Sequence, residues 1–71
     1  MATQIKAHIT GTIWKIKVEV GQQVDEGDTL VIIESMKMEI PVSSPRAGRV
    51  VELKVAEGDP AKEGQVVAVI E

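Results

Sequence analysis

The chain has 71 residues, one aromatic side chain, no cysteine and a formal net charge of −3. A core of this size leaves little room for a large catalytic cleft, and the missing cysteines exclude disulfides and thiolate zinc sites. The acidic balance and the single tryptophan give no reason to bind nucleic acid. No apolar run reaches the roughly 18 residues of a membrane span, and residues 1–4 show no signal-peptide pattern, so we expect a cytoplasmic protein without a membrane partner.

The first half of the chain alternates apolar and polar residues with a period of two, which is typical of half-buried strands. Residues 3–9 predict a short strand and residues 12–20 a longer one. The residues of the longer strand that we expect to share the buried face are Trp14, Ile16, Val18 and Val20. Trp14 is accordingly interpreted as a packing residue and not as a ligand platform.

Four further segments predict strands. The β-branched apolar runs at residues 29–33 and 66–70 are too short for buried helices and are flanked by turn residues. Residues 49–55 alternate in the same way as the longer strand, and residues 39–43 form a strand that Pro41 places at a sheet edge. No segment carries an apolar stripe at helical spacing with capping residues, so the chain is predicted to be all-β.

Residues 11–34 and 48–71 repeat one pattern at an offset of 37 residues without a gap. The identical pairs are Gly11/Gly48, Lys17/Lys54, Val18/Val55, Gly21/Gly58, Glu26/Glu63, Gly27/Gly64, Ile33/Ile70 and Glu34/Glu71. Such self-similarity predicts two copies of one supersecondary unit that share a core. We expect two small antiparallel sheets packed face to face, or a flattened barrel, with pseudo-twofold symmetry in a single domain over residues 1–71.

Glycines recur at equivalent chain reversals of the two copies, where a positive φ is most easily adopted by glycine. The glycines interpreted as structural turn residues are Gly21, Gly27, Gly48, Gly58 and Gly64.

Lys37 lies between the two copies, with Met36 before it and Met38 after it. The flanking runs, residues 30–35 and 38–42, predict a hairpin with Lys37 at its tip. Short hairpins favour Asn-Gly or Asp-Gly at positive φ, so Met-Lys breaks a local rule at one exposed place, as functional sites often do. From the residues alone, a docking or modification point and a merely solubilising lysine both remain open.

The segment Glu34-Ser35-Met36-Lys37-Met38-Glu39 resembles the modification site of the biotinyl domain family, the biotin carboxyl carriers, whose usual core is Ala/Ser-Met-Lys-Met. Ser35 stands where alanine is commoner. Glycine-bearing segments in both halves, such as Glu26-Gly27-Asp28 and Glu63-Gly64-Gln65, extend the similarity from Gln4 to Glu71. The resemblance implies a barrel-sandwich hybrid, and the gapless repeat leaves no room for the "thumb" loop of some members.

The resemblance also implies a non-catalytic carrier component of a biotin-dependent carboxylase or decarboxylase system. The sequence leaves the oligomeric state open, and a carrier that visits its partners is most simply a monomer. A biotin protein ligase would join biotin to Lys37, a biotin carboxylase would carboxylate it, and a carboxyltransferase would pass the carboxyl group on from this swinging arm. The residues that the resemblance assigns to partner recognition are Glu34, Ser35, Met36, Met38 and Glu39.

Three alternatives remain. A lipoyl carrier would have the same fold and lysine position with lipoate as cofactor, although lipoyl domains usually show Asp-Lys-Ala. An unmodified β interaction module would leave the lysine bare. A free-standing enzyme is disfavoured, because His8 is the only histidine, Ser43 and Ser44 suit a linker, and the carboxylates at residues 25–28 suit a solvated turn; no metal site is expected.

Overall fold

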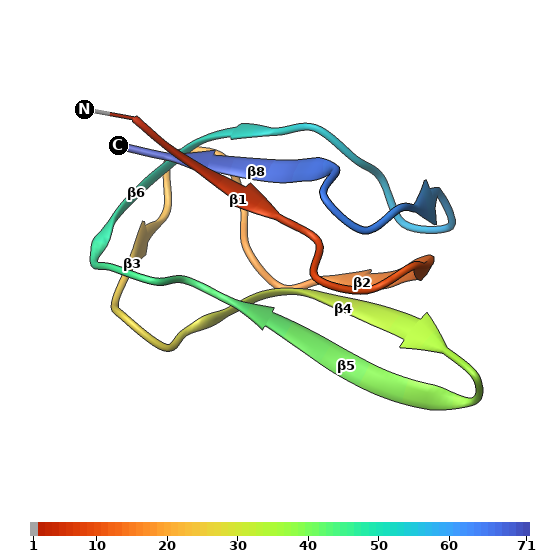
Figure 1. Cartoon of the computed structure of the whole chain (residues 1–71). Coiled ribbons are helices and arrows are strands. Elements are labelled where there is room, and N and C mark those ends of the chain that lie inside the picture. The colour runs from red at the N-terminus through yellow and green to blue at the C-terminus, as the bar shows by residue number, and fades with distance from the viewer. Residues whose placement is uncertain (1) are drawn as a thin grey trace.

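The computed structural model describes residues 2–71, which form strands and turns without a helix (Figure 1). Over this range there is accordingly no helix long and apolar enough to cross a membrane. The strands are β1 (Thr3–Lys6), β2 (Gly11–Ile16), β3 (Gln23–Val24), β4 (Thr29–Ser35), β5 (Met38–Ser43), β6 (Gly48–Leu53), β7 (Pro60–Ala61) and β8 (Val66–Ile70).

The strands form two four-stranded sheets, with the orders β1-β8-β6-β3 and β5-β4-β2-β7, and the paired strands are antiparallel. The prediction of two small antiparallel sheets is therefore confirmed. Exchanging each of β1 to β4 with its counterpart among β5 to β8 converts one order into the other. The sequence repeat is therefore a pseudo-twofold symmetry of the fold. Each sheet takes two strands from each half of the chain, which interlocks the halves.

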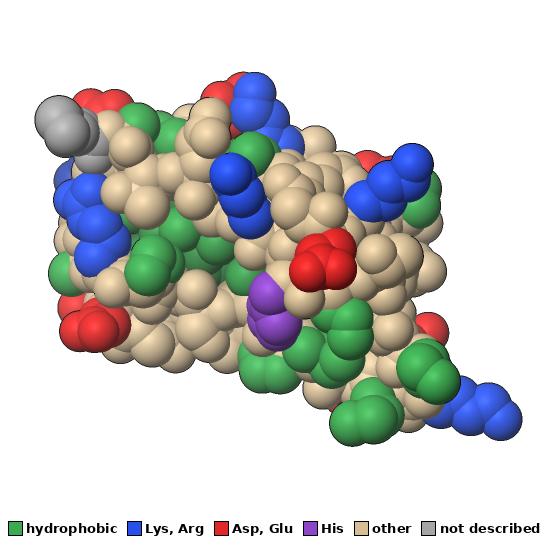
Figure 2. All heavy atoms as spheres, in the orientation of Figure 1, with side chains coloured by type: hydrophobic (Ala, Val, Ile, Leu, Met, Phe, Trp, Pro, Cys, Tyr) green, Lys and Arg blue, Asp and Glu red, His purple; other side chains and the backbone are tan. Residues whose placement is uncertain are grey.

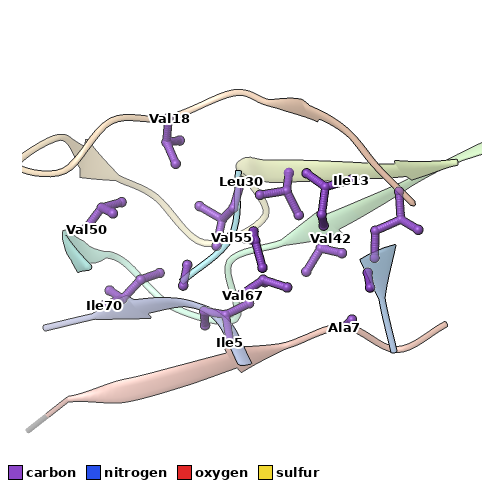
Figure 3. Packing of buried hydrophobic residues seen from close by; sticks show 14 of the residues in the cluster. Ile5, Ala7, Ile13, Val18, Leu30, Val42, Val50, Val55, Val67 and Ile70 are labelled. Atoms are coloured by element: carbon purple, nitrogen blue, oxygen red, sulfur yellow. The ribbon is translucent and has the colours of Figure 1, made fainter. Parts of the chain in front are cut away.

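The core lies between the two sheets and is wholly aliphatic. Figure 3 shows side chains from strands of both sheets pointing into the same space. The largest fully buried side chains are Ile13, Leu30, Ile33, Ile70, Val24, Val31, Val50 and Val67. Removal of this apolar surface from water is the main stabilising term, and both halves of the chain contribute to it.

The strand predicted over residues 12–20 ends at Ile16 and contains a β-bulge. The register with β4 shifts between Ile13 and Lys15, so one extra residue resets the alternation of the two faces. Ile13 is fully buried, whereas the next residue, Trp14, is 40% exposed. The prediction that Trp14 packs on the buried face is wrong, because the bulge turns it to the outer surface of the sheet.

The other three residues predicted for the buried face do not all lie there. Val18 is buried and Ile16 packs against the core, but Val20 is 61% exposed, because the strand has already ended before the turn at Gly21.

The second half of the chain repeats the bulge at the equivalent place. The pairing of β6 with β8 shifts between Val50 and Glu52, and Val51, which corresponds to Trp14, is also 40% exposed. Because two different side chains are turned outward to the same extent, the bulge is a property of the repeated backbone and not of the tryptophan.

Four of the five predicted turn glycines have the expected backbone. Gly21, Gly27, Gly58 and Gly64 have φ between 88° and 94°, where a side chain would be strained. An equivalent hydrogen bond from a backbone N–H to a side chain closes the turns at Gly27 and Gly64. The Asp25 N–H donates to Asp28 Oδ2 at 2.9 Å, and its counterpart, the Lys62 N–H, donates to Gln65 Oε1 at 3.0 Å.

Gly48 is not a turn glycine, which corrects the sequence prediction. It begins β6 without a positive φ, and a Cβ atom there would collide with a methyl group of Ile70 and lie 2.9 Å from the carbonyl oxygen of Glu71. Its counterpart Gly11 makes the equivalent approaches to Ile33 and to the backbone of Glu34, with the closer backbone contact of the two. Glycine is needed at both positions because two backbones approach each other closely there.

Candidate functional site

The hairpin of β4 and β5 carries the predicted lysine turn. The two strands pair from Thr29 opposite Ser43 to Ser35 opposite Met38, which leaves only residues 36–37 as the loop. Lys37 thus lies at the tip, as predicted, and β5 with its proline is the edge strand of its sheet.

Both loop residues adopt the left-handed conformation, with φ of 53° at Met36 and 64° at Lys37. They are the only non-glycine residues with positive φ in the described range 2–71. Two consecutive positive φ angles are typical of a type I′ turn, whose twist matches that of the flanking strands. A non-glycine residue pays about 1–2 kcal/mol for this conformation, so the tip carries side chains that stability alone would not favour.

The side chains of the turn project into solvent. Met36 is 92% exposed and Met38 is 63% exposed, while Lys37 is exposed between them. Figure 2 shows hydrophobic side chains gathered at the hairpin end and a basic side chain reaching beyond them. The one ion pair found in residues 2–71 joins Lys54 to Glu52, so the ammonium group of Lys37 is not held by a carboxylate. The amine is therefore presented to any partner.

Two carboxylates flank the base of the turn. Glu34 and Glu39 lie directly opposite each other on β4 and β5, and both are exposed. Like charges at directly opposed positions are destabilising in a sheet. The pair makes the hairpin acidic just below its tip, where the side chains are apolar and basic.

Ser35 lies between this pair of carboxylates and the turn, opposite Met38, and is half-buried. Its Oγ donates a hydrogen bond to the carbonyl oxygen of Thr10 at 2.9 Å. Sequence reasoning did not single out Thr10, and the sequence carries no signal for it, since the accepting atom is a backbone carbonyl oxygen that meets Ser35 only in the folded chain.

The turn and the chain termini lie at opposite ends of the molecule (Figure 1). The body measures 33 × 17 × 17 Å. At the terminal end, β1 and β8 pair with Thr3 opposite Ile70, which matches the pairing of Ile40 with Ile33 in the hairpin. The pseudo-twofold thus relates two equivalent strand pairs: β4 and β5 are joined by the lysine turn, whereas β8 and β1 end in the chain termini.

The residues weighed for other chemistry are not brought together. His8 and Ser43 are exposed, and the buried Ser44 donates its hydroxyl hydrogen to the carbonyl oxygen of Arg46. Within residues 2–71, no group of three His, Cys, Asp or Glu side chains is placed to hold a metal ion.

Trp14 has its own partner on the outer surface of the sheet. The ammonium nitrogen of Lys15 lies 5.6 Å from the centre of the Trp14 ring, within the range of a cation–π interaction.

Residues 1–70 match the family described as "Biotin-requiring enzyme". The chain belongs to this family. It is 43% identical to the biotin/lipoyl attachment protein of Bacillus subtilis (strain 168) over 63 residues, which cover 89% of this chain and 86% of the relative. It is also 43% identical to a biotinylated protein, the TB7.3 homolog of Mycobacterium leprae (strain TN), over 70 residues that cover 99% of both chains.

The fold of this biotin-requiring family member is also found within a much larger solved structure. Kluyveromyces lactis urea carboxylase superimposes with a TM-score of 0.95 at 37% identity, over 100% of this chain and 6% of that one. The resemblance drawn from the lysine turn and the repeated glycines is confirmed by the family match and by this superposition.

Proposed function

We propose that Lys37 is the residue to which biotin is attached, and that residues 1–71 form one biotinyl domain that works as a biotin carboxyl carrier. The observation that carries the proposal is an exposed lysine at the apex of a two-residue left-handed turn, in a chain of the biotin-requiring family. The carboxyl group of biotin would form an amide with Nζ of Lys37, with loss of water. A biotin protein ligase would supply the activation with ATP.

The scaffold suits a carrier because only the arm needs to move. The core and the interlocked sheets hold the hairpin, while the four methylene groups of Lys37 give the attached ring its reach. A biotin carboxylase would place a carboxyl group on the biotin, and a carboxyltransferase would remove it, so the catalytic groups belong to the partners. The description of the M. leprae relative as biotinylated and the urea carboxylase superposition support this role.

We assign recognition by these partners to the side chains around the lysine. Met36 and Met38 offer flexible, polarisable contacts to an apolar slot, and Glu34 and Glu39 offer charge to a basic rim. Ser35 lies between the two sets. Because the tip must visit several enzymes in turn, we propose that the carrier acts as a monomer, in the cytoplasm.

Lipoate is the second candidate, because the B. subtilis relative is described as a biotin/lipoyl attachment protein. Lipoate carries a carboxyl group on an aliphatic chain, as biotin does, and would form the same amide with the same amine.

Intact-mass spectrometry after incubation with a biotin protein ligase, ATP and biotin tests the proposal. The wild type is expected to gain the mass of one biotin less one water, and Lys37→Arg to gain nothing. Lys17→Arg is the matched control, since it makes the same change at an exposed lysine on the body, and it should be labelled like the wild type.

Labelling of Lys37→Arg would contradict the assignment of Lys37 as the attachment site. An unlabelled wild type would contradict the biotin assignment, and a gain with a lipoyl ligase and lipoate would then support the lipoyl carrier. No gain with either ligase would leave the interaction module as the function.

A further inference from the structure

We infer that Thr10 and Ser35 are positioning residues that hold the lysine turn in the orientation in which the modifying enzyme meets it. The inference rests on the proposed function, because it concerns the same lysine. It assigns a role to Thr10, which lies between β1 and β2, far from the turn in sequence.

The hairpin extends beyond the strand that supports it. The pairing of β2 with β4 ends with Thr12 opposite Glu34, and β5 on the other side is an edge strand. Ser35 is therefore the first residue of β4 without a backbone partner on the β2 side. Its hydroxyl supplies the missing contact by donating to the carbonyl oxygen of Thr10 at 2.9 Å.

Thr10 is itself held from the opposite side. Its Oγ1 accepts a hydrogen bond from the Glu63 N–H at 3.1 Å. The turn that contains Glu63 is fastened in turn to the segment before Thr10, where the Gly64 N–H donates to the carbonyl oxygen of Ala7 at 2.8 Å. Thr10 is thus bonded to the body through its side-chain hydroxyl and to Ser35, the last residue before Met36, through its carbonyl oxygen.

The pseudo-twofold provides an internal comparison for these bonds. Bonds that the fold requires occur twice, as in the Ala7–Gly64 contact, whose counterpart is the 2.8 Å bond from the Gly27 N–H to the carbonyl oxygen of Ser44. The hydroxyl of Thr10 has no counterpart, because Ala47 occupies the equivalent position. The second copy folds without it. The bonds that join Ser35, Thr10 and Glu63, here called the brace, are therefore specific to the hairpin end.

Loss of the brace would let the turn pivot about the end of the β2–β4 ladder. The amine would then spend less time in the presented orientation, and a ligase that binds that orientation would show a lower apparent affinity. Because the bound turn is held by the ligase itself, the effect should lie mainly in KM and not in kcat.

Ser35→Ala is the test, measured by two readouts. Its kcat/KM for biotinylation by the ligase should fall about threefold through KM, as expected for one hydrogen bond. The 15N heteronuclear NOE of the Lys37 amide should fall in the unmodified chain, which reports faster motion of the turn. Ser35→Thr restores a hydroxyl and should recover both values.

Ser43→Ala is the matched control. Ser43 is exposed at the far end of the same hairpin, and its hydroxyl makes no hydrogen bond within the described residues, so neither readout should change. Thr10→Val keeps the branched shape but loses the acceptor for Glu63, and it should lower the NOE of the Lys37 amide as well.

The inference is overturned if Ser35→Ala keeps the wild-type kcat/KM and NOE, or if Ser43→Ala loses as much as Ser35→Ala. If the ligase does not label the wild type, the proposed function fails by itself. The NOE comparison uses unmodified protein, so in that case a reduced value still supports the brace and an unchanged value overturns it.

Discussion

The hairpin end and the terminal end of the molecule are built from equivalent strands. At the hairpin end, β4 and β5 are joined through Met36 and Lys37. At the terminal end, β8 and β1 pair in the equivalent register, with Ile70 opposite Thr3, although no turn connects them. The register of the sheets is therefore specified by core packing, and the turn is not needed to impose it.

The comparison separates what the fold requires from what has been added to it. The bulges, the turn glycines and the close approaches of Gly11 and Gly48 occur at both ends. The left-handed non-glycine turn, the opposed pair of Glu34 and Glu39, and the Thr10 hydroxyl occur only at the hairpin end. Features that occur at only one of two equivalent ends, the first two of which weaken local stability, are best explained by function.

The largest effect on stability should come from a substitution of Gly11, and it should exceed that of the same substitution at its counterpart Gly48. A Cβ at residue 11 would collide with the carbonyl oxygen of Glu34 inside the paired hairpin, whereas at residue 48 the backbone contact, with the carbonyl oxygen of Glu71, is longer at 2.9 Å and lies beyond the last strand residue. We expect Gly11→Ala to lower the free energy of unfolding by about 3 kcal/mol and Gly48→Ala by about 1 kcal/mol, measured by urea denaturation. A loss at residue 48 as large as that at residue 11 would show that the two approaches are equally rigid.

The next effect should be equal in the two halves. Gly27 and Gly64 have φ of 91° and 88°, and nothing lies within 4 Å of a Cβ at either position, so a side chain there meets only backbone strain. Gly27→Val and Gly64→Val should each cost about 2 kcal/mol, or roughly 10 °C in the thermal midpoint. Gly27→Asn is the control and should cost less, since asparagine tolerates this conformation. Unchanged midpoints for both valine variants would refute the role of these turns.

The smallest effect should have the opposite sign. Met36→Asn places a residue that accepts positive φ in the type I′ turn, and we expect it to raise the free energy of unfolding by about 1 kcal/mol. Biotinylation of Lys37 should slow in the same variant, because an exposed apolar contact is lost. Met38→Asn, on the strand, should lose the contact without the gain in stability. A destabilised Met36→Asn would mean that Met36 packs better than its 92% exposure indicates.

Much of the fold could be predicted from the sequence because its signals are local and occur twice. Alternation with a period of two predicts strands, the 37-residue repeat predicts their equivalence, and glycines mark the reversals. The position of Lys37 follows from the same logic, since a residue between two copies of one unit must lie in the connection between them.

The sequence could not reveal where the alternation is interrupted. The sets Trp14, Ile16 and Val18 and Ile13, Ile16 and Val18 are both wholly apolar. The second set can share a face only if a bulge follows Ile13, and only packing between the sheets selects that bulge. The two-residue strands β3 and β7 were missed for a similar reason, because two residues carry no period.

The remaining errors concern contacts between segments distant in sequence. Gly48 meets the backbone of Glu71, and the carbonyl oxygen of Thr10 meets the hydroxyl of Ser35, only in the folded chain.

The adjacency of the two termini, at the end remote from Lys37, governs how such a body can be tethered. A flexible linker joined at either terminus would attach at the far end of a body 33 Å long, without touching the lysine turn. The end-to-end distance of a linker grows only as about the square root of its length, so linker length would set the effective concentration of the biotin arm at each partner site. Linker length and turn chemistry could then change independently, the first adjusting how often the arm arrives and the second which enzymes accept it.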